Sequence, residues 1–270
     1  SCLLPYSIHL LLNPSKLFLL SGPCAVENEE TTLRTAEHLV ELTSKLQIPY
    51  VFKASYKKAN RTKSNSFTGI GNEKALKILG KVRKEFDVPV VTDIHESSEA
   101  AIAAEYVDVL QIPAFLFRQT DLLQAAAKTG KLVNIKKGQF AAAKAMEFAA
   151  KKVTDAGNNR VLLTERGNMF GYGDMIVDYR NLVWMKQMGF PVVMDCTHAL
   201  QQPNNGSGIT GGLPSLIEPI AKAAVAVGVN GLFLETHPNP SEALSDGANM
   251  LPLHQMEDLL NKLLRIHESL

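Results

Sequence analysis

The 270-residue chain is poor in the features that mark several large classes of protein. It has only three cysteines, too few for a disulfide scaffold and in keeping with a reducing compartment such as the cytoplasm. No apolar run approaches the roughly 18 residues of a membrane helix. The net charge is +1, from 28 Lys and Arg against 27 Asp and Glu, so we expect no binding to nucleic acid or to a membrane surface through excess positive charge.

The chain also lacks the G-x-G-x-x-G turn that follows the first strand of dinucleotide-binding open sheets. Instead, short continuous apolar runs alternate with longer amphipathic stretches, a pattern typical of parallel strands buried on both faces and joined by helices. The runs lie at residues 17–20, 50–52, 90–92, 109–112, 132–135, 161–164, 192–194 and 232–234. The stretches with helical periodicity lie at residues 29–46, 73–86, 99–106, 119–128, 141–153, 177–187, 216–227 and 256–267.

Eight strand–helix units in series predict an α/β fold, the (β/α)8 TIM barrel. We expect a single domain over residues 1–270, because no linker interrupts the chain and barrels of this class have about 250 residues. Residues 1–16 are mildly apolar and are predicted to form an N-terminal cap on the barrel. An open doubly wound sheet is the alternative, and the missing glycine motif disfavours it.

Polar residues follow directly after the predicted strands, and in a barrel these strand ends meet at one mouth, where active sites are built. Five of them are cations, Lys53, Lys58, Arg61, Lys136 and Arg166. Cations gathered in a cleft attract phosphate and carboxylate groups, and their origin in different strands predicts two anionic substrates. For any single one, a solvated surface side chain is the alternative.

Residues of the kinds that bind metals form a second group. Cys24, His198, Glu235 and Asp246 follow the first, seventh and eighth strands, which barrel closure makes neighbours. A thiolate, an imidazole and two carboxylates suit a borderline divalent ion such as Zn²⁺, Fe²⁺ or Mn²⁺. A small buried thiol and a hydrogen-bonded loop histidine are the alternatives for Cys24 and His198. We therefore expect the carboxylates to gather beside a metal and the cations to gather around the substrates.

The motifs that carry these residues resemble the 3-deoxy-D-manno-octulosonate 8-phosphate synthase family from about residue 17 to residue 253. They are GPCAVEN (22–28), FKASYKKANR (52–61), TDIHE (92–96), QIPAFLFRQTDLL (111–123), KKGQF (136–140), ERGNMFGY (165–172), THALQ (197–201) and ETHPNP with ALSDGANMLPL (235–253). The resemblance implies a cytoplasmic, homotetrameric TIM-barrel enzyme. It condenses phosphoenolpyruvate with arabinose 5-phosphate and releases phosphate, on the route to lipopolysaccharide.

The resemblance also implies roles for individual residues. Lys58, Lys136 and Arg166 would bind phosphoenolpyruvate, with Lys53 and Gln111 nearby, and Asn60 and Arg61 would hold arabinose 5-phosphate. The substrate-binding candidates further include Ser55, Asp93, His95, Ala114, Phe115 and Gln201. The catalytic candidates are Lys58, Asn60, His198 and Asp246. Members that work without a metal carry Asn at the position of Cys24, so the present cysteine, with His198, Glu235 and Asp246, indicates the metal-dependent class.

Two other functions are weighed against this one. A related synthase uses erythrose 4-phosphate, but it typically has Lys-Pro-Arg-Thr where this chain has Lys58-Ala-Asn-Arg61. A barrel that senses a phosphorylated sugar without catalysis would use the same cations. The chain departs from the family pattern at Thr62-Lys63, where Ser-Ser is common, and at Leu213-Pro214, where many members have Arg after Gly-Gly. Residues 204–212 are predicted to form a loop that closes over the mouth.

Overall fold

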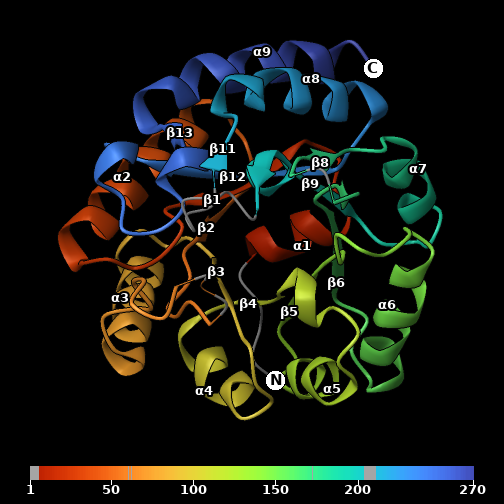
Figure 1. The fold of residues 1–270 in the computed structure, drawn as a ribbon, viewed down its shortest axis with the longest axis horizontal. Helices are drawn as coiled ribbons and strands as arrows, with labels where there is room; N and C mark the ends of the chain where they lie inside the picture. Colours follow the sequence, from red (N-terminus) through yellow and green to blue (C-terminus); the bar gives the residue numbers. More distant parts are fainter. Residues whose placement is uncertain (1–5, 60, 62, 172, 204–210) are drawn as a thin grey trace.

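The computed structural model describes residues 6–59, 61, 63–171, 173–203 and 211–270. Within them, eight parallel strands form a closed ring, in which β1 pairs with both β2 and β12. These strands are β1 (Phe18–Gly22), β2 (Tyr50–Lys53), β3 (Val90–Asp93), β4 (Val109–Ile112), β5 (Leu132–Lys136), β6 (Val161–Glu165), β9 (Val192–Asp195) and β12 (Gly231–His237). Helices surround the ring (Figure 1), and the predicted TIM barrel is confirmed.

The outer helices begin and end close to the predicted limits. They are α2 (Glu29–Lys45), α3 (Asn72–Glu85), α4 (Glu99–Tyr106), α5 (Thr120–Lys128), α6 (Ala145–Asp155), α7 (Arg180–Lys186), α8 (Ile217–Val227) and α9 (Met256–Glu268). The clearest difference is at α6, which starts four residues later than predicted. There the carbonyl of Ala141 accepts hydrogen bonds from the Lys137 ammonium and the Asn168 amide, so side chains take the place of helical backbone bonds. No helix in the described part is long and apolar enough to span a membrane.

Two apolar cores hold the barrel together. The larger lies between the strands and the surrounding helices, and Leu39 of α2 and Leu79 of α3 are fully buried there. The smaller fills the interior of the ring. Every strand contributes at least one residue to it, such as Phe18 and Leu20 of β1 and Phe233 of β12. Because the interior is packed with side chains, the chemistry must take place at the ends of the strands.

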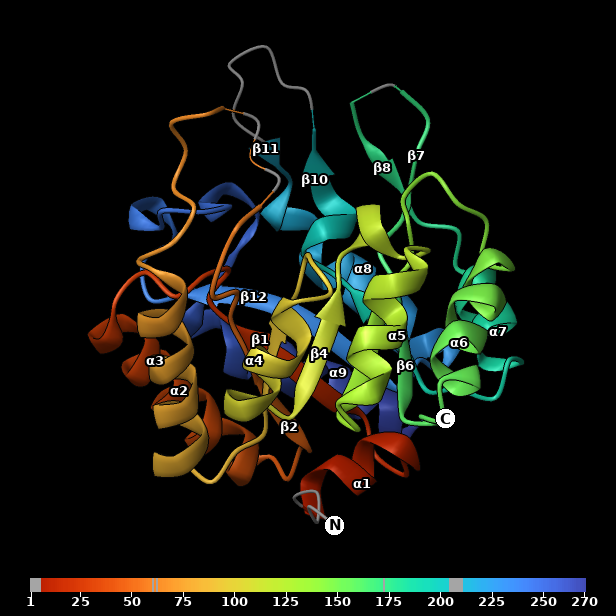
Figure 2. The ribbon, with the colours of Figure 1, turned by 90° about the horizontal axis from the view of Figure 1, so that it is seen from below.

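The N-terminal end of the ring is closed by α1 (Tyr6–Leu12), as predicted for the cap. Ile8 and Leu11 are buried among the interior residues of the strands. Figure 2 shows α1 beneath the barrel and longer connections above it. Those connections include the hairpin of β7 (Asn168–Met169) and β8 (Met175–Ile176) and the ribbon of β10 (Gln201–Gln202) and β11 (Gly211–Gly212). A short strand, β13 (Leu251–Pro252), extends the sheet beside β12.

Candidate active site

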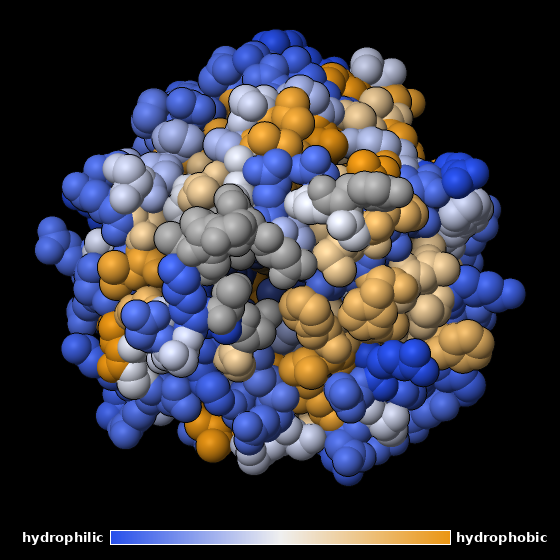
Figure 3. Space-filling view, in the orientation of Figure 1, coloured by the Kyte–Doolittle hydropathy of each residue, from blue (hydrophilic) through white to orange (hydrophobic). Residues whose placement is uncertain are grey.

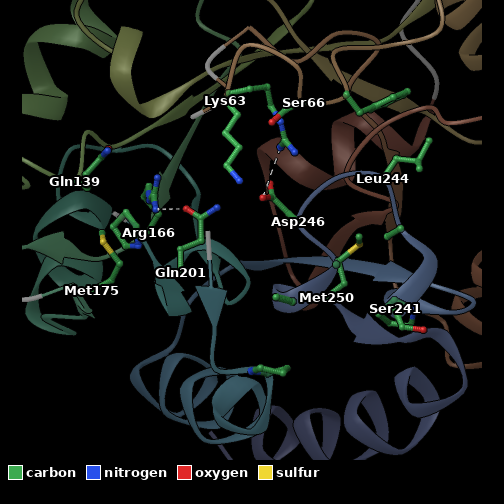
Figure 4. Close-up of a pocket in the computed structure, with 18 of the residues that line it drawn as sticks. Lys63, Ser66, Gln139, Arg166, Met175, Gln201, Ser241, Leu244, Asp246 and Met250 are labelled. Carbon is green, nitrogen blue, oxygen red and sulfur yellow. Dashed lines mark hydrogen bonds and ion pairs between the residues drawn. The ribbon is translucent and has the colours of Figure 1, made fainter. Parts of the chain in front are cut away.

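A cleft of about 1110 Å³ opens at the C-terminal ends of the strands. Arg61, Arg166, Gln201 and Asp246 line it, and Figure 4 shows Lys63 extending into it from the loop after β2. The remaining predicted site residues that the structure describes also lie at or just after strand ends. The structure therefore brings the predicted residues to one mouth. Asn60 and Thr62, and residues 204–210 of the predicted closing loop, lie outside the described part of the chain.

Two buried cations at this mouth, Lys53 and Lys136, are held by carboxylates. Lys53 Nζ lies 2.6 Å from Glu235 Oε1 and donates to the carbonyl of Cys24 at 3.0 Å. Lys136 Nζ lies 2.6 Å from Asp195 Oδ2 and 3.7 Å from the centre of the Phe233 ring. Burial lowers the pKa of Lys136 although Asp195 opposes that effect. These contacts fix both ammonium groups in place before any substrate binds.

Lys58 belongs to a second chain of contacts, which runs from β2 to β3. Its ammonium donates to Ser55 Oγ at 3.0 Å, and Ser55 in turn donates to Asp93 Oδ1 at 2.6 Å. Burial alone would lower the pKa of Lys58, but attraction to Cys24 and Asp93 raises it above the usual value. Burial would raise the pKa of Asp93, but Lys58 and Lys53 hold it well below its usual range. His95 is largely buried beside this chain, with Nε2 3.8 Å from Asp93 Oδ2.

The expected separation of cations from carboxylates is therefore wrong. Lys53 pairs with Glu235, Lys136 with Asp195, and Arg61 lies 3.8 Å from Asp246. Charges of both signs are interleaved because an unpaired charge at this depth would carry a large desolvation cost. The mouth is a network of paired charges. An anion can bind there to cations that their carboxylate partners already hold in position.

Arg166 directly follows β6, and Gln111 lies on β4. Arg166 Nη2 donates to the carbonyl of His198 at 3.0 Å and to Gln201 Oε1 at 2.9 Å, and Figure 4 shows the contact with Gln201. Its Nε is buried and has no hydrogen-bond partner among the described residues, so one donor is left for a ligand. Gln111 is buried, and its Oε1 accepts from Asn134 at 3.1 Å. Of the two candidates in the turn after β4, Ala114 is 5% exposed and Phe115 is 54% exposed.

His198 is oriented by the carboxylate of Asp195. Its Nδ1 lies 2.7 Å from Asp195 Oδ2, and its backbone N–H donates to Asp195 Oδ1 at 2.9 Å. Because a carboxylate accepts hydrogen bonds, the neutral ring carries its proton on Nδ1 and leaves Nε2 as an acceptor. That Nε2 lies 3.7 Å from Glu235 Oε1. Carboxylate–histidine pairs of this kind commonly orient a ligand of a metal ion.

Three of the four predicted metal ligands form a compact group. The ligand atoms of Cys24, Glu235 and Asp246 all lie within 4.8 Å of one another. Cys24 Sγ is 3.3 Å from Asp246 Oδ2, and Glu235 Oε2 is buried without a hydrogen-bond partner among the described residues. His198 stands outside this group but adjoins Glu235. The donor set fits a borderline divalent metal ion, and the unpartnered carboxylate oxygen is the atom that such an ion would satisfy.

The pKa values of Cys24 and Glu235 are shifted in opposite directions. Burial, together with the charge of Glu235, raises the pKa of Cys24 to about 12. Burial would also raise the pKa of Glu235, but Lys53 and His198 bring it down to about 2. Cys24 therefore stays a thiol beside the ionised carboxylate of Glu235 unless a cation joins them. A bound divalent metal deprotonates a thiol that coordinates it.

Sequence reasoning gave no role to two residues that the structure places in the site. Asp195 holds both Lys136 and His198, and its position three residues before a histidine at a strand end was the available signal. Ser245 lies 3.2 Å from Cys24 Sγ and accepts from Arg61 at 2.8 Å. Nothing in the sequence distinguishes this serine from others in loops, because both contacts cross more than 180 residues.

The sequence profile of the DAHP synthetase I family matches residues 13–270 of the chain. The 2-dehydro-3-deoxyphosphooctonate aldolase 1 of Arabidopsis thaliana is 52% identical over 254 residues, which cover 92% of this chain and 88% of that protein. The 2-dehydro-3-deoxyphosphooctonate aldolase of Koribacter versatilis is 51% identical over 257 residues, covering 94% and 92% of the two chains. That of Acidithiobacillus ferrooxidans is 53% identical over 249 residues, covering 92% and 89%. The resemblance inferred from the motifs is confirmed over nearly the whole chain.

Proposed function

The chain belongs to the DAHP synthetase I family, and from that premise we propose how its barrel mouth carries out the reaction. The protein is an enzyme that condenses phosphoenolpyruvate with D-arabinose 5-phosphate and water. The products are 3-deoxy-D-manno-octulosonate 8-phosphate and phosphate, in KDO biosynthesis. Relatives that share half of their residues across the whole barrel carry the name of the octulosonate enzyme, which disfavours both the erythrose 4-phosphate synthase and a sensor without catalysis.

The observation that carries the mechanism is the set of fixed cations at the mouth. We propose that Lys58, Lys136 and Arg166 hold the phosphate and carboxylate of phosphoenolpyruvate, with Lys53 and Gln111 beside them. Arg166 has a free donor at Nε, and Lys136 is fixed by Asp195. Preorganised cations stabilise charge without reorganising during the reaction. The further contacts proposed to the substrates come from Ser55, Asn60, Asp93, His95, Ala114, Phe115 and Gln201.

Positioning then supplies much of the catalysis, because the two phosphates fix the reacting carbons side by side. C3 of phosphoenolpyruvate attacks the aldehyde carbon of arabinose 5-phosphate, whose oxygen takes up a proton and becomes a hydroxyl. C2 gains oxocarbenium character, and water adds there and loses a proton. The tetrahedral intermediate breaks its C2–O bond to phosphate, and the C2 hydroxyl passes its proton to the leaving phosphate as the C2 ketone forms. We propose that His198 and Asp246 hold the protons exchanged in these steps, with Lys58 and Asn60 at the aldehyde.

We propose that Cys24, His198, Glu235 and Asp246 hold a divalent ion such as Zn²⁺, Fe²⁺ or Mn²⁺. When bound, such an ion supplies Lewis acidity, either to orient the aldehyde or to lower the pKa of a water molecule. The support is the compact donor group, the unpartnered oxygen of Glu235 and the orientation of His198 by Asp195. The carboxylate of Asp195 keeps the acceptor nitrogen of His198 turned toward this group.

Offering each aldehyde to the purified protein tests the reaction. Phosphate release from phosphoenolpyruvate is expected with arabinose 5-phosphate, and much slower release with erythrose 4-phosphate. Faster turnover of the four-carbon sugar would overturn the substrate assignment. No release with either sugar, before and after metal is added, would instead favour a binding protein.

We propose that Arg61 holds the phosphate of arabinose 5-phosphate, and replacing Arg61 tests this role. Arg61→Ala is expected to raise KM for arabinose 5-phosphate about ten- to a hundredfold, because a hydrogen bond to a charged group contributes about 1.5–3 kcal/mol. Steady-state phosphate release at varied sugar concentration measures it. KM for phosphoenolpyruvate should change little, and Arg265→Ala, at an exposed position on α9, should change neither. An unchanged sugar KM in Arg61→Ala would remove the proposed role.

We propose a homotetramer whose contacts include an apolar face beside the mouth. Phe148 and Phe170 are each 64% exposed, Ile176 is 54% exposed and Trp184 is 44% exposed. The last three line one groove of about 670 Å³, and Figure 3 shows hydrophobic residues gathered on that side of the molecule. Apolar surface of this extent is typical of contacts between subunits. In the proposed homotetramer, a second copy of the chain covers this apolar face.

Phe170→Glu combined with Trp184→Glu is expected to lower the mass in solution, because burying two added carboxylates in an apolar contact is unfavourable. Sedimentation equilibrium of the wild type and the double variant measures this. Val227→Glu, at a 39% exposed position on α8, is the matched control and should sediment as the wild type does. A double variant with the mass of the wild type would exclude this face from the assembly.

We also propose that residues 1–270 act as one synthase domain and that the enzyme works in the cytoplasm. The eight barrel strands share one closed ring, and α9 buries Leu259 and Leu263 against the common outer core. Cys24 and Cys196 are buried and free of disulfide bonds, as thiols in a reducing compartment are.

A further inference from the structure

Glu27, between β1 and α2, connects two distant segments of the chain, and the mechanism above gives it no role. Its Oε1 accepts a hydrogen bond from the backbone N–H of Leu244 at 2.5 Å. Its Oε2 lies 3.3 Å from Nε2 of His237, at the end of β12. The Glu27 side chain is 7% exposed and that of His237 is 6% exposed, so both contacts are largely shielded from water.

The contact between Glu27 and His237 has a defined direction. The Nδ1 of His237 accepts a hydrogen bond from the backbone N–H of Asn239 at 3.0 Å. A neutral imidazole that accepts at Nδ1 carries its proton on Nε2, so His237 donates to the Glu27 carboxylate. Glu27 is thus an acceptor from both sides, once from a backbone amide and once from a ring N–H. Only a carboxylate side chain, that of Glu or Asp, offers two acceptor oxygens and no donor, as these two bonds require.

The three segments that Glu27 joins are those that carry the compact group of metal ligands. Glu27 itself lies three residues after Cys24, and His237 lies two residues after Glu235. Leu244 lies two residues before Asp246. Figure 4 shows Asp246 directed into the cleft, with Leu244 farther out on the same loop. Each hydrogen bond therefore holds the chain two or three residues away from a proposed metal ligand.

The loop that carries Asp246 has particular need of such an anchor. Ser241, Glu242 and Leu244 are exposed, so few apolar contacts hold the segment that leads to the ligand. Asp246 adopts φ of +50°, a left-handed conformation that costs free energy for a residue other than glycine. Such a conformation persists only where the surrounding contacts determine it. The bond from Leu244 to Glu27 is one of those contacts.

We propose that Glu27 is a positioning residue that assembles the metal-ligand group, by clamping the loop of Asp246 and the end of β12 onto the segment of Cys24. This inference rests on the metal site proposed above. Its consequence is that metal affinity depends on a carboxylate that is not itself a ligand. Residues that orient metal ligands from outside commonly change metal affinity about 10- to 100-fold when they are replaced.

The test is Co²⁺ binding to the full-length protein after its metal has been removed. Competition with a chromophoric chelator gives Kd, and the thiolate-to-cobalt charge-transfer band reports whether Cys24 coordinates. Glu27→Ala is expected to weaken binding about 10- to 100-fold and to reduce this band. Glu27→Gln keeps the size of the side chain, but its amide oxygen can accept only one of the two bonds, so an intermediate loss is expected.

Two comparisons separate positioning from a general loss of stability. Glu30→Ala, at an exposed position three residues along the chain, should bind cobalt as the wild type does. His237→Ala should weaken binding alone but add little to Glu27→Ala, because both changes break the same connection. Wild-type affinity and an unchanged band in both Glu27 variants would overturn the clamp alone. A wild type that binds no cobalt, or binds it without the thiolate band, would overturn the metal site and the clamp with it.

Discussion

Removing the proposed divalent metal ion is expected to reduce the rate of the condensation about a thousandfold. Lewis-acid assistance contributes several kcal/mol to catalysis, and about 4 kcal/mol corresponds to a factor of this size. The measurement is phosphate release after dialysis against a chelator, followed by addition of Zn²⁺, Fe²⁺ or Mn²⁺ one at a time. Activity should return with at least one of them, which identifies the ions that the donor set accepts.

Cys24→Ala should lose activity to a similar degree, and added metal should restore little of it. Removing the thiolate leaves two carboxylates and an imidazole, which bind a borderline ion less well. Cys196→Ala is the matched control, because Cys196 is also buried but lies in the apolar core, where its thiol donates to the carbonyl of Met194 at 3.8 Å. It should respond to chelation and to metal as the wild type does. Full activity of Cys24→Ala after rigorous chelation would contradict the metal assignment.

The barrel itself could be predicted from the sequence because its signals are local. Each strand is a short apolar run, and most of the outer helices are amphipathic stretches of the right period. The predicted start of a helix was wrong where a side chain competes with the backbone for a hydrogen bond. At α6 the carbonyl of Ala141 is taken by Lys137 and Asn168, which lies 27 residues away, and no local pattern signals that contact.

The location of the site residues followed from the fold, but their pairing did not. Alternation along a strand tells which side chains reach the mouth, and barrel order tells which strands are neighbours. Neither pattern fixes the rotamer of a long side chain or how far along the barrel axis its end group lies. The pairing of Lys53 with Glu235 and of Lys136 with Asp195 depends on both. The cost of burying a charge alone was the available physical argument, and it favours the interleaved arrangement.

Replacing Lys136 is the other change with a large expected effect. Lys136→Met is expected to lower kcat/KM for phosphoenolpyruvate about 100- to 1,000-fold. It removes a fixed cation that makes charge-assisted hydrogen bonds of about 1.5–3 kcal/mol each, and 1.36 kcal/mol is a tenfold change in rate. It also takes the ammonium partner from the buried carboxylate of Asp195, which keeps its hydrogen bond with the ring of His198, and this loss destabilises the fold. Steady-state kinetics at varied phosphoenolpyruvate, and thermal unfolding of the same samples, measure the two effects.

A double variant separates these effects. Lys136→Met with Asp195→Asn removes both charges of the pair, so no carboxylate stays buried without its cation, and stability should recover toward that of the wild type. Activity should not recover, because the cation that receives the substrate is still missing. Lys74→Met, on the exposed face of α3, controls for the loss of a positive charge and should change neither quantity. If the double variant regained both stability and affinity for phosphoenolpyruvate, Lys136 would be a partner of Asp195 in the fold and not a binding group for the substrate.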